Sequence, residues 1–145
     1  MRQIGQRRLW IGHAGDLLNP RSILALGVEA IIELADNEQF AEFPRDLLRM
    51  RFPLSDGGDN SEWLLRLVIG NLVNLIRAEI PTIVCCSYGA NRSVCVVAAA
   101  ISINEIMEID SALQLVVALG PADVSPALWN QTRKCAQAFC KPPMS

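Results

Sequence analysis

The stretch CCSYGANRS, residues 85 to 93, combines two thiols, a glycine and an arginine within a few positions. An apolar run, PTIVCC, leads into it, and an apolar helical pattern that starts near Arg92 follows it. Residues 86 to 92 are therefore expected to turn from the end of a strand into the first turn of a helix. Free backbone N–H groups and the positive end of the helix dipole meet at such a turn, which favours the binding of an anion.

The side chains in this loop suit phosphate chemistry. The field that binds an anion also stabilises a thiolate, which is the nucleophilic form of cysteine. Gly89 allows the backbone to close around the anion, and Arg92 offers a planar pair of donors for two phosphate oxygens. The residues by themselves therefore indicate a nucleophile beneath a bound phosphoryl group.

The rest of the chain supplies the elements that hold this loop. Strands are expected at residues 9–12, 28–35, 47–54 and 81–86, and helices at 19–27, 60–80, 92–102, 110–120 and 124–139. Residues suited to the helix starts are Asn19, Asp110 and Ser125, and the tryptophans Trp10, Trp63 and Trp129 are interpreted as core. Alternating strands and helices predict a single α/β domain. It has a central, mostly parallel sheet of about four to five strands with helices on both faces, and the phosphate-binding loop joins a strand to a helix.

The bulk composition limits the class of protein. The 145 residues, 51% of them hydrophobic, suffice for one domain with a sizeable core. A net charge of −2 gives no general basic field for nucleic acid, and no apolar run has the length of a membrane span. Five irregularly spaced cysteines and a single histidine favour reduced thiols over disulfides or a metal site. We therefore expect a soluble cytoplasmic protein with no metal, no cofactor, and no nucleic-acid or membrane partner.

The loop CSYGANRS resembles the C-x-x-G-x-x-R-[ST] signature of the cysteine-based protein tyrosine phosphatases, most closely their small dual-specificity branch. The spacing selects Cys86 as the nucleophile, because Arg92 lies six residues after it, whereas Cys85 would have Asn91 there. The resemblance implies that residues 1–145 form one catalytic domain of this type. It also implies that Cys86 attacks phosphorus and forms a phosphocysteine intermediate.

The same resemblance assigns roles to the other loop residues. Backbone amides would hold the three phosphoryl oxygens, and Arg92 would clamp them. Ser93 would donate a hydrogen bond to the Cys86 sulfur and ease breakdown of the intermediate. The phosphate-binding set consists of Ser87, Tyr88, Gly89, Ala90, Asn91 and Arg92.

A general acid is expected in the segment RFPLSDGGDN, residues 51 to 60. Asp56 matches the family position after an apolar-Pro-apolar motif, and it would protonate the leaving oxygen and later deprotonate the attacking water. Asp59 is the alternative, although its place just before a helix also suits an ordinary capping role. Gly57 and Gly58 would give the loop freedom to move.

Two positions depart from the family pattern. Cys85 stands where the family usually has a histidine that hydrogen-bonds the loop. We expect its side chain to face away from Cys86, because adjacent strand residues alternate faces. A redox role for the vicinal pair is the other interpretation. Tyr88 occupies a position that is commonly small, where it would stack on a substrate or narrow the mouth of the site.

Three functions compete on the sequence. The first is a phosphomonoesterase acting on phosphotyrosine, phosphoserine or phosphothreonine in proteins. Its substrate would alternatively be a non-protein phosphate, such as an inositol phosphate or an RNA 5′ end. RNA fits the acidic chain least well. The second is a phosphate-binding pseudophosphatase, and the third is a sulfurtransferase, which Arg92, Ser93 and the upstream acid argue against. The expected partner is a phosphorylated protein or small phosphate, with the oligomeric state left open. A basic cluster before the acid segment is interpreted as solvated surface or as a substrate-steering feature: Arg45, Arg49 and Arg51.

Overall fold

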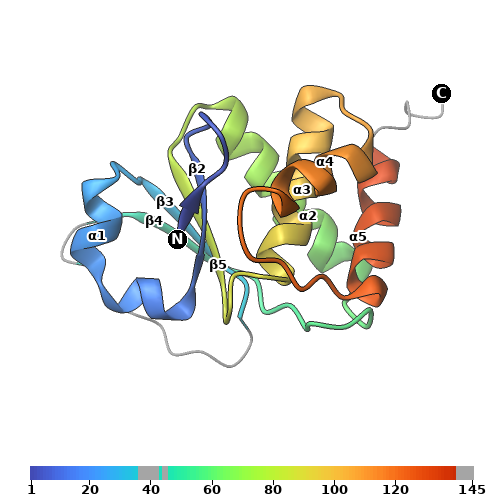
Figure 1. The fold of residues 1–145 in the computed structure, drawn as a ribbon, viewed down its shortest axis with the longest axis horizontal. Coiled ribbons are helices and arrows are strands. Elements are labelled where there is room, and N and C mark those ends of the chain that lie inside the picture. The colour runs from blue at the N-terminus through green and yellow to red at the C-terminus, as the bar shows by residue number, and fades with distance from the viewer. Residues whose placement is uncertain (36–42, 44–45, 140–145) are drawn as a thin grey trace.

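The computed structural model describes residues 1–35, 43 and 46–139, and a five-stranded sheet forms its centre (Figure 1). The strands are β1 (Arg2–Gln3), β2 (Leu9–His13), β3 (Ala30–Glu33), β4 (Leu48–Arg51) and β5 (Thr82–Cys86). Their order in the sheet is β1-β2-β5-β3-β4, with β1 antiparallel to β2 and the other neighbours parallel. The strand that leads into the cysteine loop is therefore the central one, and β1 is an addition that the sequence patterns did not predict.

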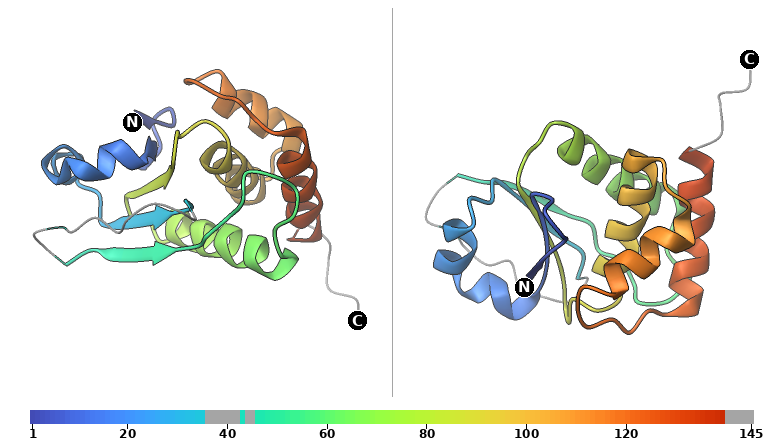
Figure 2. Two further views of the ribbon diagram at one scale, coloured as in Figure 1. Left: turned by 90° about the horizontal axis from the view of Figure 1, so that it is seen from below. Right: turned by 45° about the horizontal axis from the view of Figure 1, so that its top comes forward.

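Helices cover both faces of the sheet (Figures 1 and 2). One face carries the short 3₁₀ helix η1 (Ala14–Leu18) and α1 (Pro20–Ala25). The other carries α2 (Glu62–Arg77), α3 (Arg92–Glu105), α4 (Ile109–Val117) and α5 (Pro126–Phe139). This arrangement confirms the predicted α/β fold with a mostly parallel sheet between two helical layers.

The two layers give two separate hydrophobic cores, and β5 contributes to both. Ile83 and Cys85 pack in the smaller core beneath η1 and α1, whereas Val84 and Cys86 face the larger core beneath α2 to α5. This follows from the alternation of side chains along a strand. The two adjacent cysteines therefore point to opposite faces of the sheet, as predicted.

Helix α3 lies at the centre of the larger layer and is buried along most of its length. Every residue from Arg92 to Ser102 is buried, and α3 packs against α2, α4 and α5. A helix enclosed on all sides cannot shift without opening cavities in the core, because protein interiors are close-packed. The first turn of α3, which carries the arginine of the loop, is therefore held firmly.

Two local predictions need correction. Trp10 and Trp129 are buried, but the side chain of Trp63 is 67% exposed. The buried stripe of α2 runs through Leu65, Val68 and Leu72, and Trp63 lies off this stripe in the first turn. Helix α4 starts at Ile109, one residue earlier than expected, because Glu108 accepts hydrogen bonds from the N–H groups of Asp110 and Ser111.

Asn19 is the N-cap residue of α1 and Pro20 its first residue, as predicted, although the Asn19 side chain makes no capping hydrogen bond. At the start of α5, by contrast, Ser125 Oγ accepts a hydrogen bond from Leu128 N at 3.3 Å, in agreement with its predicted role.

The predicted basic cluster is only partly within the described residues. Arg49 donates a hydrogen bond to Glu33 at 3.2 Å between neighbouring strands, so its charge is offset by a buried carboxylate. Arg45 and Cys140 lie outside the described residues. None of the helices in the described part of the chain combines the length and hydrophobicity needed to cross a membrane.

Candidate active site

The cysteine loop is anchored from outside through its carbonyl groups. Three carbonyl oxygens accept hydrogen bonds from neighbouring segments: Ser87 O from Ala14 N at 3.4 Å, Gly89 O from Arg2 Nη2 at 3.1 Å, and Ala90 O from Asp123 N at 2.8 Å. A fourth, Asn91 O, accepts from Cys95 N at 2.9 Å in the first turn of α3. In a planar trans peptide the C=O and N–H groups point in opposite directions. The N–H groups of the four following residues therefore turn away from these anchors, toward the interior of the loop. Such a set of convergent amides is a binding site for an anion.

Cys86 lies at the base of this loop, at the end of β5. Its residue is 3% exposed, and its sulfur accepts a hydrogen bond from Gly89 N at 3.2 Å. Gly89 has a φ angle of +68°, and a Cβ atom there would lie 2.8 Å from Gly12 O. A glycine is required at position 89 for both reasons, and its amide then reaches the sulfur.

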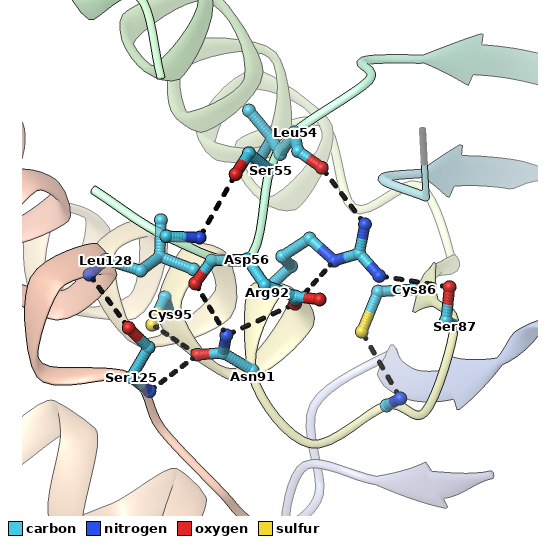
Figure 3. Close-up of polar contacts among 12 residues, drawn as sticks. Leu54, Ser55, Asp56, Cys86, Ser87, Asn91, Arg92, Cys95, Ser125 and Leu128 are labelled. Carbon is cyan, nitrogen blue, oxygen red and sulfur yellow. Dashed lines mark hydrogen bonds and ion pairs between the residues drawn. The ribbon is translucent and has the colours of Figure 1, made fainter. Parts of the chain in front are cut away.

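Arg92 begins α3 and is 3% exposed, and its guanidinium connects three groups around the site (Figure 3). Nη1 donates to Leu54 O at 3.0 Å, and Nη2 donates to Ser87 Oγ at 3.0 Å. Nε lies 3.0 Å from Asp56 Oδ1 in an ion pair. A buried charge of this kind needs such partners, because an uncompensated one would be strongly destabilising.

Asp56 reaches the cysteine loop and Asp59 does not. Besides its ion pair with Arg92, Asp56 receives two hydrogen bonds from Asn91 Nδ2, one to its carbonyl at 3.1 Å and one to its carboxylate at 3.2 Å. Asp59 instead accepts a hydrogen bond from Ser55 Oγ within its own turn at 2.8 Å. The side chain of Asp56 is 62% exposed, so it faces the solvent side of Arg92. The structure thus brings together the expected nucleophile, the arginine and the expected acid.

The remaining loop residues are placed as follows. Tyr88 is 84% exposed and Ala90 and Asn91 line the site's pocket. The side chain of Ser93 is completely buried, and its Oγ has no hydrogen-bond partner in the described structure. The hydrogen bond expected from Ser93 to the Cys86 sulfur is therefore not formed here, and Gly89 N occupies that role instead. Cys85 lies on the opposite face of the sheet, where burial raises the pKa of its thiol above the usual range.

A pocket of about 670 Å³ opens above the loop. Its walls are the acid segment at Asp56 and Gly57, the cysteine loop, and residues 123–126 before α5. Asn91 joins the last two, because its Oδ1 accepts a hydrogen bond from Ser125 N at 2.9 Å. Among the described residues, no group of three or more histidine, cysteine, aspartate or glutamate side chains is arranged to hold a metal ion.

Two contributors to the site were missed by the sequence patterns. Residues 123–126 form a wall of the pocket, although the sequence patterns indicated only a link between two helices and the start of the second. Arg2 reaches Gly89 from β1, at a distance of 87 residues along the chain. No local sequence pattern predicts a contact between residues so far apart along the chain. The sequence shows only that Arg2 is a charged residue near the start of the chain.

Comparison with solved structures identifies the architecture. The crystal structure of human DUSP28 superposes with a TM-score of 0.85, covering 97% of this chain and 98% of that one at 20% sequence identity. This chain has the fold of the small dual-specificity phosphatases. The resemblance seen in the loop is thereby confirmed at the level of the fold.

Other dual-specificity-type structures agree closely with this chain. A mouse putative dual specificity phosphatase in complex with zinc tungstate matches with a TM-score of 0.83 and 20% identity over 95% of this chain and 87% of that one. The human tyrosine phosphatase-like serine/threonine/tyrosine-interacting protein matches with a TM-score of 0.82 and 15% identity, over 97% and 98%. No protein-family model matches the sequence, and no curated protein matches it significantly.

Proposed function

We propose that this protein hydrolyses phosphomonoesters through a phosphocysteine intermediate, with phosphotyrosine, phosphoserine or phosphothreonine proteins as substrates. One observation supports this most directly. Cys86 and the guanidinium of Arg92, both from the cysteine loop, converge with the carboxylate of Asp56, from the separate acid segment, on one open pocket. Neither a structural thiol nor a surface ion pair requires that convergence.

In the first step, the Cys86 thiolate attacks phosphorus. A P–S bond forms as the ester P–O bond breaks, and the leaving oxygen takes a proton from the carboxyl group of Asp56. The inward amides of the loop and Arg92 hold the three phosphoryl oxygens and stabilise the charge that develops on them. Because Asp56 is paired with Arg92 before substrate arrives, the phosphate displaces the carboxylate and frees it for this role.

In the second step, water attacks the phosphocysteine. The Asp56 carboxylate takes a proton from the water, the P–S bond breaks, and inorganic phosphate and the Cys86 thiolate are released. The Ser93 hydroxyl stabilises the departing sulfur in this step. Its Oγ is buried without a partner in the described structure, so it is available to rotate toward the sulfur when negative charge forms there.

The decisive experiment is hydrolysis of p-nitrophenyl phosphate by the purified chain, with and without vanadate. Turnover that vanadate inhibits and that Cys86→Ser abolishes is the expected result, because a hydroxyl lacks the nucleophilicity of a thiolate. The matched control is Cys85→Ser, which should keep most of the activity because Cys85 faces the other side of the sheet. Comparable turnover by Cys86→Ser would refute the covalent mechanism.

The substrate class is tested separately. The pocket is open and Tyr88 stands exposed at its rim, which suits a phosphorylated side chain on a protein surface. A non-protein phosphate is the competing class, since PTPMT1, another structure of this fold (TM-score 0.73, 11% identity), was crystallised with PI(5)P. A screen of phosphotyrosine, phosphoserine and phosphothreonine peptides against inositol phosphates decides between them through kcat/KM.

A phosphate-binding protein without catalysis is the second candidate function. The unformed bond from Ser93 to Cys86 favours it, as does the replacement of the family histidine by Cys85. Calorimetric titration with phosphate or vanadate distinguishes the two. Binding without turnover of any phosphate in the screen supports the binding protein, whereas turnover eliminates it.

A further inference from the structure

Arg2 fastens the cysteine loop to the segment before α5. Its Nη2 atom donates to Gly89 O at 3.1 Å and to Pro121 O at 2.8 Å. Its side chain lies directly against Gly120, where an added Cβ atom would overlap Arg2 Cδ and Nε. The glycine therefore leaves room for the arginine. Together, Arg2, Gly89, Gly120 and Pro121 form one packed contact, which we call the Arg2 clamp.

We propose that Arg2 is a positioning residue of the active site, which orients the Gly89–Ala90 peptide and stabilises the Cys86 thiolate. This inference rests on the proposed phosphocysteine mechanism. It assigns to β1 a role that the loop motif does not contain.

The orienting effect follows from peptide geometry. By holding Gly89 O on the outside of the loop, Arg2 turns the N–H of Ala90 toward the inside, where the phosphoryl oxygens would bind. Gly89 itself is held on another side by its close approach to Gly12 O. Its own amide donates to the Cys86 sulfur, so any rotation at Gly89 would disturb both the oxyanion donors and the thiolate.

The electrostatic effect follows from mutual attraction. Burial lowers the pKa of Arg2, and the negative charge of a Cys86 thiolate opposes this shift. The same interaction acts in both directions, so the guanidinium of Arg2 stabilises the thiolate by as much as the thiolate stabilises the guanidinium.

The other ionisable groups around Cys86 are Arg92 and Cys95 on α3, Cys85 on its own strand, His13 on β2 with its partner Asp16, and Asp56. Of these, Arg92 is a cation already paired with Asp56, which leaves Arg2 as a separate source of positive charge.

The clamp also explains how the loop is held with cysteine in place of the family histidine. The side chain of Cys85 packs in the smaller core, on the opposite face of the sheet from Cys86. Arg2 reaches the loop from outside and supplies both the hydrogen bond and the charge.

The test measures the reactivity of Cys86 without requiring turnover. The rate of its alkylation by iodoacetamide is followed from pH 4 to 9 by mass spectrometry, with fragment ions that separate Cys86 from Cys85. In Arg2→Met, the pH at half-maximal rate should rise, because one positive charge near the sulfur is lost. The matched control is Arg7→Met, which removes the same charge from the same part of the chain, where Arg7 pairs with Glu105. It should leave the midpoint unchanged.

Two further variants separate the two effects. Arg2→Lys keeps the charge but cannot donate to Gly89 and Pro121 from one planar group, so its alkylation midpoint should stay near wild type while kcat/KM falls. Gly120→Ala displaces Arg2 without changing any charge, and it should also lower kcat/KM, by roughly 10-fold. This loss is smaller than the ~10²–10³-fold loss in kcat that follows removal of a direct oxyanion donor. Gly70→Ala in α2, where a Cβ meets only ordinary contacts, is the control for a glycine-to-alanine change.

The outcomes distinguish this inference from the proposed mechanism. An Arg2→Met protein with the wild-type alkylation profile, wild-type kcat/KM and unchanged Tm would overturn the inference and leave the mechanism intact. Failure of the mechanism would instead appear as normal alkylation of Cys86 with no turnover by any variant, including wild type. A shifted profile in Arg2→Met but not in Arg7→Met, at equal Tm, supports the positioning role.

Discussion

Arg92 carries the positive charge at the centre of the candidate site, and its geometry explains why an arginine is needed. Its three nitrogens contact a backbone carbonyl, a hydroxyl and a carboxylate, each at 3.0 Å. A lysine has one compact ammonium group and cannot reach three partners in one plane. The fork shape of the side chain, in addition to its charge, is what connects the acid segment to the cysteine loop.

We expect Arg92→Lys to lower affinity and rate together. The variant keeps the charge but loses the fork, which should cost about 2–4 kcal/mol of transition-state stabilisation, as for loss of an oxyanion-hole donor. The measurement is kcat/KM on an aryl phosphate. Unchanged kinetics would mean that the guanidinium does not contact substrate.

Asp56 is expected to be the general acid, since it contacts Arg92 and Asn91 whereas Asp59 bonds Ser55 in its own turn. Asp56→Asn should slow hydrolysis of an alkyl phosphate or phosphoserine by roughly 10²–10⁴-fold, because a poor leaving group needs a proton. An activated nitrophenyl ester should be affected far less. Asp59→Asn is the matched control, and the same pattern there with none in Asp56→Asn would exchange the two roles.

The residues of the site were predictable to different degrees. Cys86, Arg92 and Gly89 lie within seven positions, so spacing alone places them in one loop. Asp56 was expected from the resemblance, because it matches the family position after the apolar-Pro-apolar motif. Arg2 could not be found, because its contact depends on how β1 pairs with β2, which no local pattern encodes. The bond expected from Ser93 to the sulfur is absent from the described structure, in which Gly89 N donates to Cys86, so the role of Ser93 stays a prediction.

At the scale of elements, α3 ends in an unfavourable conformation. Ile106, just after the helix, has φ 52° and ψ 52°, the left-handed conformation in which a β-branched residue is strained. Its side chain is 94% exposed, so it gains little from packing. Glycine is the residue usually found at such a helix end.

Ile106→Gly should therefore stabilise the protein by about 1 kcal/mol, because relief of the strain outweighs the added freedom of the unfolded chain. Urea unfolding measures the change as a higher midpoint with the same slope. Asn74→Gly, at an exposed position inside α2, is the control and should destabilise by roughly 0.3 kcal/mol, the difference between the helix propensities of asparagine and glycine. A lower midpoint for Ile106→Gly would show that the isoleucine makes contacts that outweigh its strain.

The prediction of elements succeeded where patterns were long and failed at their ends. The helices α2, α3 and α5 have long apolar stripes, and their positions were predicted well. The start of α4 was displaced by one residue because the carboxylate of Glu108, with two oxygens, caps two N–H groups at once. Trp63 was assigned to the core because helical spacing does not show where the neighbouring layer ends.

At the scale of the whole molecule, the described cysteines differ in reactivity according to their place in the fold. Burial raises the pKa of Cys85 and of Cys135, and it raises the pKa of Cys95 to about 12. A thiol with a raised pKa is protonated at pH 7, and the thiolate is the reactive form. Only Cys86, among these four, faces the active-site pocket.

A brief treatment with iodoacetamide at pH 7 should therefore modify Cys86 before Cys85, Cys95 or Cys135. Peptide mass spectrometry measures the order, and vanadate should protect Cys86 by occupying the same pocket. Raising the pH toward 12 should increase the reactivity of the other three, because their thiolates then form. Early modification of Cys95 at pH 7 would mean that α3 opens to solvent more readily than its burial implies.

The ion pair between Asp56 and Arg92 gives the site its own counter-ion. An arginine without such a partner would attract any small anion in the buffer, whereas here the carboxylate already balances the charge. A phosphate that enters exchanges one anion for another, so few dissolved ions are released when it binds. Substrate affinity should consequently depend less steeply on ionic strength than in a site whose cation faces the solvent alone.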